Sequence, residues 1–250
     1  MSSIAREPLQ GPDTRNLVSA RSLSRFAKRS ARDLLQAHIP VGPWGRPLFS
    51  ALYHLHVLAR ESLALATRFF WYEPLFRSQC HRVGARFSME QLPYLYGRGE
   101  ISIGDDVRFS GKQTLLFSSR HCSCPSLLIG TGTFLGHNSC LMIASRIEIG
   151  KHTLIASGAR ISDFDGHPLD AEQRRRGEFV APDRVLPVRI GEDVWIGNGA
   201  TVLKGVTIGD RSIIGASAVV TQSIPADCIA AGNPARIVKR LPPPVLGQLA

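Results

Sequence analysis

The sequence predicts a mainly β fold, in which short parallel strands stack as a solenoid behind an α-helical N-terminal region. The main observation is a six-residue period across residues 188–221. Its aliphatic members are Ile190, Ile196, Val202, Ile208, Ile214 and Val220. Glycine follows four of the six, and neither the period of a strand nor that of a helix produces this spacing. A fixed internal repeat of this kind is typical of solenoids, in which each coil packs on its neighbours.

Each hexad predicts one short strand and one corner of a coil. The aliphatic side chain points inward and stacks on its equivalent in the next coil. Small residues stand four places later, where a corner leaves little room: Ala200, Ser212 and Ala218. Glycine accepts the backbone conformations that a tight bend demands. If three hexads close one triangular coil, Ile190 stacks on Ile208 and Ile196 stacks on Ile214.

Composition sets the broad class of the protein. The chain has 250 residues, of which 44% are hydrophobic, so it can bury a large core in one or two domains. Its net charge of +10 favours anionic partners such as phosphates, nucleotide-like cofactors or an acidic membrane surface, with plain solubility as the alternative. The five cysteines lack metal-type spacing, and residues 1–12 lack the apolar core of a signal peptide. We therefore expect a reduced, cytoplasmic protein.

Residues 1–100 are expected to form a helical, basic N-terminal region. Apolar residues recur at helical spacing over residues 17–36, and the opposite face is basic, with Arg21, Arg25, Lys28, Arg29 and Arg32. A second apolar helix is expected over residues 47–80, but charged residues and histidines interrupt it too often for a membrane-spanning helix. Two interpretations stay open: the region binds an anionic membrane surface peripherally, or it packs on the solenoid as a helical cap.

The solenoid is expected over residues 101–241, with a C-terminal tail at residues 242–250. A recurring signal, aliphatic-x-Ile-Gly, marks coil starts at Ile103, Ile129, Ile149, Ile190 and Ile208. The last interval of 18 residues is one clean coil, whereas the interval of 41 residues after Ile149 requires an insertion. This insertion is the charged loop 163–187. Long loops on rigid scaffolds often carry function.

His167 stands at the root of this loop and is the candidate general base. An imidazole titrates near neutral pH, so it can accept a proton from a hydroxyl group and return it. Its second ring nitrogen would need an acceptor, for which Asp163, Asp165 and Glu178 are candidates. The ordinary alternative is a solvated loop histidine without a catalytic role.

Three segments carry motifs that belong together. They are Asp163-Phe-Asp-Gly-His167-Pro, the segment that begins at Pro187 and includes Trp195, and the ending from Ala230 to Lys239. Together they resemble the hexapeptide-repeat acyltransferases, and in particular the sugar O-acetyltransferase branch with its maltose, galactoside, nodulation-factor and exopolysaccharide acetyltransferases. The resemblance covers residues 147–241 well. It implies a left-handed parallel β-helix and a homotrimer with active sites between the subunits.

The resemblance also implies acetyl-CoA as the cosubstrate and gives roles to individual residues. An acceptor hydroxyl deprotonated by His167 would attack the thioester directly, and the backbone amide of Asn198 would stabilise the oxyanion. Trp195 would wall the pantetheine channel. Four other positions would contact the rest of the cosubstrate, Ala216 and Thr221 at the pantetheine and adenine end and Arg236 and Lys239 at the phosphates. Gln222 departs from the lysine that is frequent in the family, so Arg211 or residues 174–176 would have to supply that phosphate contact.

The expected reaction is transfer of an acetyl group to a hydroxyl of a saccharide, such as a surface-polysaccharide or lipid-linked precursor. Two alternatives use the same scaffold, namely N-acetylation of a nucleotide-linked amino sugar and O-acetylation of serine. A third alternative, of another class, is a non-catalytic scaffold. Nucleic acid is not an expected partner.

A metal site is not expected either. Some hexapeptide-repeat proteins are zinc carbonic anhydrases, and His137, His152 and His167 follow one another at intervals of 15 residues. However, His137 and His152 occupy different positions in their hexads. Their side chains should therefore leave different parts of the coil.

Overall fold

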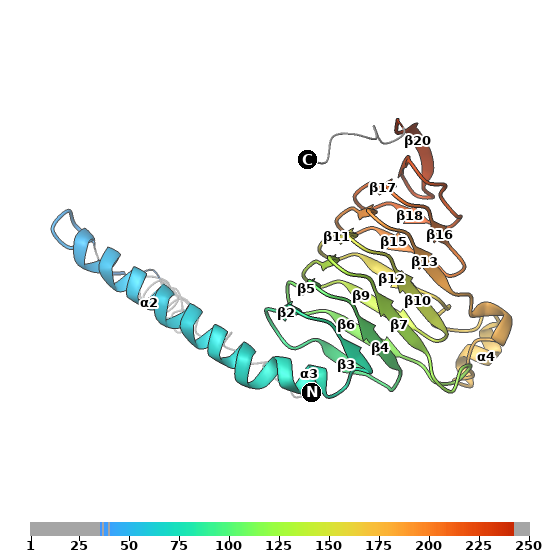
Figure 1. The fold of residues 1–250 in the computed structure, drawn as a ribbon, viewed down its shortest axis with the longest axis horizontal. Helices are drawn as coiled ribbons and strands as arrows, with labels where there is room; N and C mark the ends of the chain where they lie inside the picture. Colours follow the sequence, from blue (N-terminus) through green and yellow to red (C-terminus); the bar gives the residue numbers. More distant parts are fainter. Residues whose placement is uncertain (1–35, 37, 40, 243–250) are drawn as a thin grey trace, which may run out of the picture. The chain divides into compact units, whose positions relative to one another are not determined.

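The computed structural model describes residues 36, 38–39 and 41–242 of the chain (Figure 1). Its contacts divide the chain into two units, Met1–Leu58 and Ala59–Ala250. Except for Gln36, the basic helix expected over residues 17–36 lies outside the described residues. Residues 243–250 of the expected C-terminal tail also lie outside them.

Helical structure runs through residues 46–77, close to the expected range of 47–80. It consists of α2 (Arg46–Thr67), one turn of π-helix (Arg68–Tyr72) and α3 (Glu73–Arg77). No residue of α2 is buried, whereas α3 buries Phe76. The ring of Phe76 stacks on Phe87 at 5.6 Å between centroids and meets Phe109 edge-on at 5.8 Å. The short helix α3 therefore covers the first coils, as a helical cap would.

Short strands form three sheets, one along each side of a triangular solenoid (Figure 1). Sheet A contains β1 (Arg82–Val83), β4 (Glu100–Ile103), β7 (Ser126–Ile129), β10 (Arg146–Ile149), β13 (Val188–Ile190) and β16 (Thr207–Ile208). Sheet B contains β2 (Ser88–Met89), β5 (Arg108–Phe109), β8 (Phe134–Leu135), β11 (Leu154–Ile155), β14 (Trp195–Ile196), β17 (Ile213–Ile214), β19 (Cys228–Ala231) and β20 (Arg236–Arg240). Sheet C contains β3 (Tyr94–Tyr96), β6 (Thr114–Phe117), β9 (Cys140–Ile143), β12 (Arg160–Ser162), β15 (Thr201–Val202) and β18 (Val219–Val220).

The register of the stack confirms the predicted hexads. Ile190 pairs with Ile208, and Ile196 pairs with Ile214, each one coil apart in parallel strands. All four side chains are buried in the core that fills the triangle. The predicted corner residues are buried as well, and the Ser212 hydroxyl donates a 2.7 Å hydrogen bond to the carbonyl of Pro225. A corner can therefore contain a small polar residue when a backbone carbonyl of the next coil accepts a hydrogen bond from it.

The stack begins earlier than the expected Ile101. Strand β1 pairs with β4 in parallel, so the first coil starts at Arg82. Its start reads His81-Arg82-Val83-Gly84, which lacks the aliphatic-x-Ile-Gly signal, and the bulky Phe87 and Met89 fill its interior. The other end also departs from the repeat. Strand β20 turns back antiparallel to β19, an arrangement that a forward-winding hexad cannot predict.

Candidate active site

The insertion leaves the solenoid at the corner between sheets C and A. Strand β12 ends at Ser162 and β13 begins at Val188, so residues 163–187 form the loop (Figure 1). It contains α4 (Ala171–Arg175) and a 3-10 turn at Pro182–Arg184, and Phe164 forms an antiparallel bridge with Val185. The two ends of the loop thus lie side by side and fix its neck.

Asp163 fixes this neck to the coil beneath it. Its side chain is fully buried, and its two oxygens accept three hydrogen bonds of 2.7 Å from the backbone amides of Ala144, Ser145 and Arg146. Burial raises the pKa of the Asp163 carboxyl group, and the three amide hydrogen bonds oppose that shift. Its carbonyl also accepts from the amide of Leu186 at the far end of the loop, at 2.8 Å. Asp163 therefore holds the root of the loop in place by accepting hydrogen bonds from backbone amides.

Asp165 is held by Lys204, a partner that the sequence did not suggest. Lys204 comes from the same corner of the next coil, and its side chain is only 18% exposed where it pairs with Asp165. His167 is exposed two residues later, beside the buried Pro168. Glu178, the third candidate carboxylate, pairs with Arg176 at 2.7 Å. Within the described part of the chain, none of the three candidate carboxylates forms a hydrogen bond with His167.

Trp195 lies on a different side of the coil. It projects from the outer face of sheet B with 51% of its surface exposed. Paired residues continue this row across the sheet, from Trp195 to Ile213 in β17, to Ile229 in β19 and to Lys239 in β20. Trp195 and Lys239 therefore share one face, about 14 Å apart at the usual strand spacing.

Asn198 lies at the corner between sheets B and C. Its carbonyl accepts a 2.8 Å hydrogen bond from the Ser217 amide of the next coil, where Ala216 stands beside it. Among the residues that the structure describes, none accepts a hydrogen bond from the Asn198 amide itself. This N–H can therefore donate to a ligand.

The cosubstrate candidates near the C-terminus are exposed. Thr221 follows β18, and Arg236 and Lys239 lie in β20. The substitutes considered for the missing lysine at Gln222 have partners already. Arg211 binds both oxygens of Asp227, at 2.6 and 2.7 Å, and this pairing lowers the pKa of Asp227. Arg174 donates to the carbonyls of residues 168 and 169, and its two neighbours pair with glutamates.

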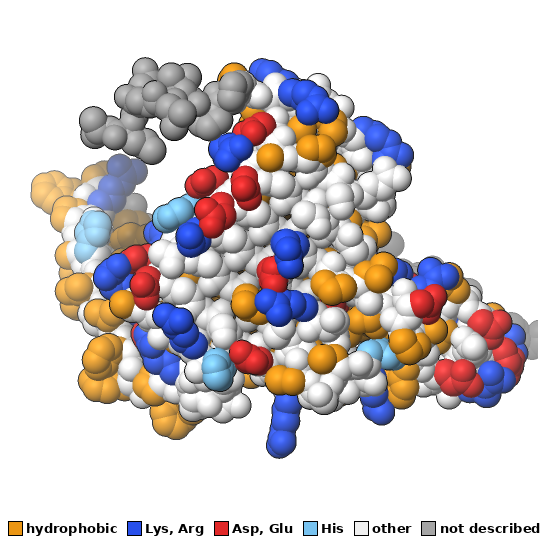
Figure 2. All heavy atoms as spheres, turned by 45° about the vertical axis from the view of Figure 1, so that its right-hand side comes forward, with side chains coloured by type: hydrophobic (Ala, Val, Ile, Leu, Met, Phe, Trp, Pro, Cys, Tyr) orange, Lys and Arg blue, Asp and Glu red, His pale blue; other side chains and the backbone are white. Residues whose placement is uncertain are grey.

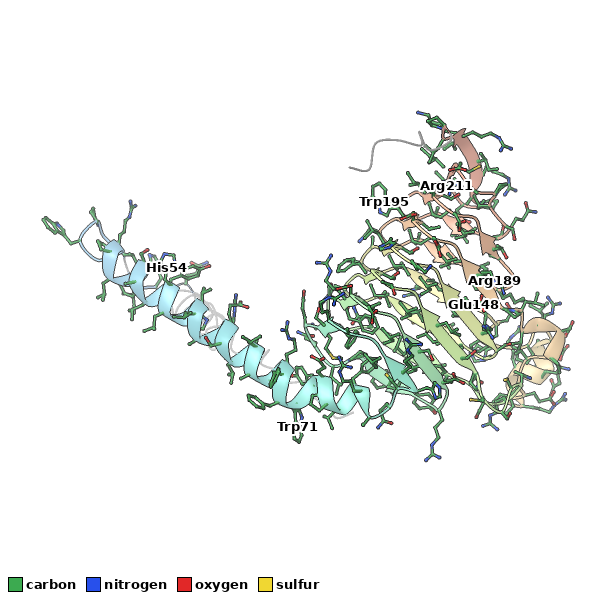
Figure 3. The ribbon with its side chains drawn as sticks, viewed as in Figure 1. His54, Trp71, Glu148, Arg189, Trp195 and Arg211 are labelled. Carbon is green, nitrogen blue, oxygen red and sulfur yellow. The ribbon has the colours of Figure 1, made fainter. Side chains whose placement is uncertain are left out.

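Within one chain, the predicted site residues therefore lie on different sides of the triangular coil and do not come together in one place. His167 lies at the corner of sheets C and A, Asn198 at the corner of sheets B and C, and Trp195 on the outer face of sheet B. Figure 3 shows Trp195 on the side of the β-helix opposite the loop that carries α4. The histidines are separated in the same way, with His152 at the corner of sheets A and B and His137 at that of sheets B and C.

Comparison with known proteins identifies relatives of the repeat region. The family model described as bacterial transferase hexapeptide (six repeats) matches residues 187–222. The chain is 36% identical over 116 residues to a putative acetyltransferase of Saccharomyces cerevisiae, covering 46% of this chain and 57% of the relative. It is 37% identical over 113 residues to the galactoside O-acetyltransferase of Escherichia coli, covering 45% and 53%. The chain therefore spans about half the length of the curated relatives it matches.

Solved structures extend the likeness beyond the repeat. A hexapeptide-repeat acetyltransferase from Vibrio cholerae, solved with acetyl-CoA, has a TM-score of 0.50 and 27% identity and covers 82% of this chain and 94% of its own. An N-acyltransferase from Bacillus cereus shares the fold alone, with a TM-score of 0.55, 20% identity and coverage of 68% and 88%.

These likenesses first define the class, a hexapeptide-repeat protein with a left-handed parallel β-helix. The relatives that match include the galactoside O-acetyltransferases of Escherichia coli and Lactococcus lactis, which agrees with the resemblance seen in the three motifs. In the described part of the chain, no helix is long and apolar enough to cross a membrane.

Proposed function

We propose that the protein is an acetyl-CoA-dependent O-acetyltransferase whose acceptor is a saccharide hydroxyl. The main support is the loop of His167, which is inserted into a hexapeptide β-helix and tied at its neck by Asp163. His167 removes the proton of the acceptor hydroxyl, and the oxygen attacks the thioester carbon. The Asn198 amide donates to the resulting oxyanion. When the intermediate collapses, the C–S bond breaks, the acetyl ester forms, and the imidazolium returns the proton to the CoA thiolate.

The distribution of these residues supports a site shared between copies. One chain places His167 and Trp195 on opposite sides of its triangular section, so a site that contains both must join two chains. A ring of three identical chains satisfies this requirement at each contact. We therefore propose a homotrimer in which one subunit supplies His167 and its neighbour supplies the wall formed by Trp195.

The row on sheet B suits the extended shape of CoA. Trp195 would line the pantetheine arm, with Ala216 one coil further at the corner of sheets B and C. Thr221, which follows β18 in sheet C, would contact the adenine end. Lys239 lies in the same row as Trp195, two strands beyond Ile213, and Arg236 lies in the same strand. Both cations are exposed and can pair with phosphate groups.

The two aspartates of the motif receive positioning roles in this proposal. Asp163 holds the loop root through backbone amides, and Asp165 holds it through Lys204. Both contacts restrict the segment that carries His167. A base held in one place by its neighbours keeps the orientation that proton transfer requires.

Release of the CoA thiol tests the function directly. Purified protein is supplied with acetyl-CoA and, in separate reactions, with galactosides, other saccharides, serine and a nucleotide-linked amino sugar. We expect thiol release with a saccharide and an acetyl ester on its product. Turnover with serine or with the amino sugar alone would identify one of the alternative acetyltransferases. Failure to bind acetyl-CoA at all would identify a scaffold.

We further propose that the N-terminal region binds an anionic membrane surface on its cytoplasmic side, where acetyl-CoA is available. Apolar residues of α2 recur at helical spacing on one face and are all exposed: Leu48, Leu52, Leu55 and Leu63. Phe70 and Trp71 follow with 74% and 62% exposure. Because α3 supplies the cap through Phe76, the apolar face of α2 needs a different partner. The basic residues of positions 17–36 add about 1 kcal/mol each at an anionic surface.

Liposome flotation should show this binding. We expect the full chain to float with vesicles that contain anionic lipid, to dissociate as salt is raised, and to lose binding when residues 1–67 are deleted. This deletion keeps α3 and its cap. Leu52→Glu, on the apolar face of α2, should weaken flotation strongly, whereas Ser50→Glu on the opposite face should weaken it slightly. Equal flotation of the two glutamate variants, or no flotation at low salt, would rule out this surface.

A further inference from the structure

An elongated groove lies on the outer face of sheet A, and none of its lining residues has a role in the reaction proposed above. It has a volume of about 590 Å³ and crosses five consecutive strands, from β1 to β13. Four intervals at the usual strand spacing give it a length of roughly 19 Å along the solenoid. This shape suits an extended chain better than a single small ring.

One row of paired residues forms its floor. Arg82 pairs with Ser102, Ser102 with Leu128, Leu128 with Glu148, and Glu148 with Arg189. Because paired residues in a parallel sheet point to the same side, all five face outward along one line. The row offers hydrogen-bond donors at both ends, a hydroxyl group, an apolar platform and an acceptor.

Neighbouring charges hold the polar groups in place. Arg189 pairs with Glu148 at 2.7 Å, and Arg146 pairs with the same carboxylate from within β10. Glu148 is therefore fixed between two guanidinium groups, and its side chain is 22% exposed. Lys151 and Glu192 pair at 3.3 Å along the edge of the groove. Figure 2, in which this side of the molecule comes forward, shows basic and acidic side chains next to each other.

This mixture of charges selects the class of ligand. A polyanion would meet the carboxylates of Glu148 and Glu192. Sugar hydroxyl groups, in contrast, both donate and accept, so they can bind arginine and glutamate in alternation. The apolar platform at Leu128 can receive the carbon face of a sugar ring.

The groove also ends next to the candidate active site. Arg189 lies three residues after Leu186, whose amide closes the neck of the His167 loop. Figure 3 shows Glu148 and Arg189 on the side of the β-helix that carries this loop, away from Trp195. A chain that occupies the groove would thus have one end at β1 and the other near the loop.

We propose that this groove binds the acceptor as an oligosaccharide chain, with the reactive end beside Arg189 and the remote end at Arg82. The proposal rests on the proposed saccharide acetyl transfer and adds an acceptor subsite to it. Four residues of the groove would then favour longer oligosaccharides over shorter ones: Arg82, Leu128, Glu148 and Arg189.

A ladder of neutral galacto-oligosaccharides of one to five rings tests the subsite. We expect kcat/KM of the wild-type protein to rise with ring number. Arg189→Ala should lower it about tenfold at every length, because a charged hydrogen-bond partner is lost near the reactive end. Arg82→Ala should lower it only for the longest members. Arg86→Ala, which breaks an exposed ion pair with Asp106 outside the groove, is the matched control and should change nothing.

Ligand-observed NMR on the same ladder without acetyl-CoA separates the two proposals. If the wild type binds longer members more tightly and Leu128→Arg abolishes binding, the groove stands even where no acetyl transfer occurs. If the oligosaccharides are acetylated but neither binding nor kcat/KM depends on ring number, the proposed acceptor subsite is wrong and the proposed acetyltransferase function stands. Dissociation of the oligomer by Leu128→Arg, seen by sedimentation, would identify a subunit interface and overturn the subsite.

Discussion

Replacement of His167 by alanine is expected to lower kcat by about 10²–10⁴-fold, the usual range for loss of a general base. The imidazole is exposed at the end of a segment whose root is fixed by Asp163 and Asp165, so its removal should leave the loop in place. The affinity for CoA and the oligomeric state should therefore remain those of the wild type. Steady-state kinetics with the saccharide found in the panel, together with calorimetric titration of CoA, measures both quantities.

A control variant makes this result specific. His81→Ala removes another exposed imidazole, close to the first coil and away from the loop, and should retain full activity. Activity of His167→Ala within threefold of the wild type would remove His167 from the mechanism and leave the solvated loop histidine as its description.

The fold could be predicted from the sequence because one physical constraint repeats. Each coil must place an aliphatic side chain inside and a small residue at a tight corner. The six-residue period therefore predicts both the strands and the way they stack. Ile190 and Ile208 pair as that period required. The first coil was missed because its start, His81-Arg82-Val83-Gly84, lacks the aliphatic-x-Ile-Gly signal. In addition, the bulky Phe87, which stacks on Phe76 of α3, stands four places after Val83, where a small corner residue was expected.

The candidate site could be predicted only in part. The sequence showed which residue types were present, but not which groups would bind their side chains. The spacing of the motif marked His167 and the aspartates, but the amides that bind Asp163 come from a coil about twenty residues earlier. Lys204 reaches Asp165 from the following coil, and nothing in the hexad pattern distinguishes it from other polar corner residues. The groove on sheet A consists of outward side chains, which the core does not constrain and which therefore show no period.

Ile208→Asp is expected to unfold the C-terminal coils. Ile208 is fully buried, pairs with Ile190 and forms a bridge with Ile224, so its side chain lies among apolar neighbours of two coils. A carboxylate there has no cation or amide to bind, and burying it costs several kcal/mol out of a total stability of about 5–15 kcal/mol. Because each coil depends mainly on its neighbours, the loss should spread from β16 toward the C-terminus. Melting followed by circular dichroism should show a large fall in Tm.

Thr207→Asp is the matched control for this substitution. Thr207 immediately precedes Ile208 in the same strand, but it points outward and is exposed. The same carboxylate stays hydrated there, so Tm should change by only a few degrees. Both variants add the same charge, so a difference in Tm between them reports the direction in which the side chain points. If Ile208→Asp melted at the temperature of Thr207→Asp, the inward register of this coil would be incorrect, and with it the stacking of the aliphatic residues that the six-residue period predicts.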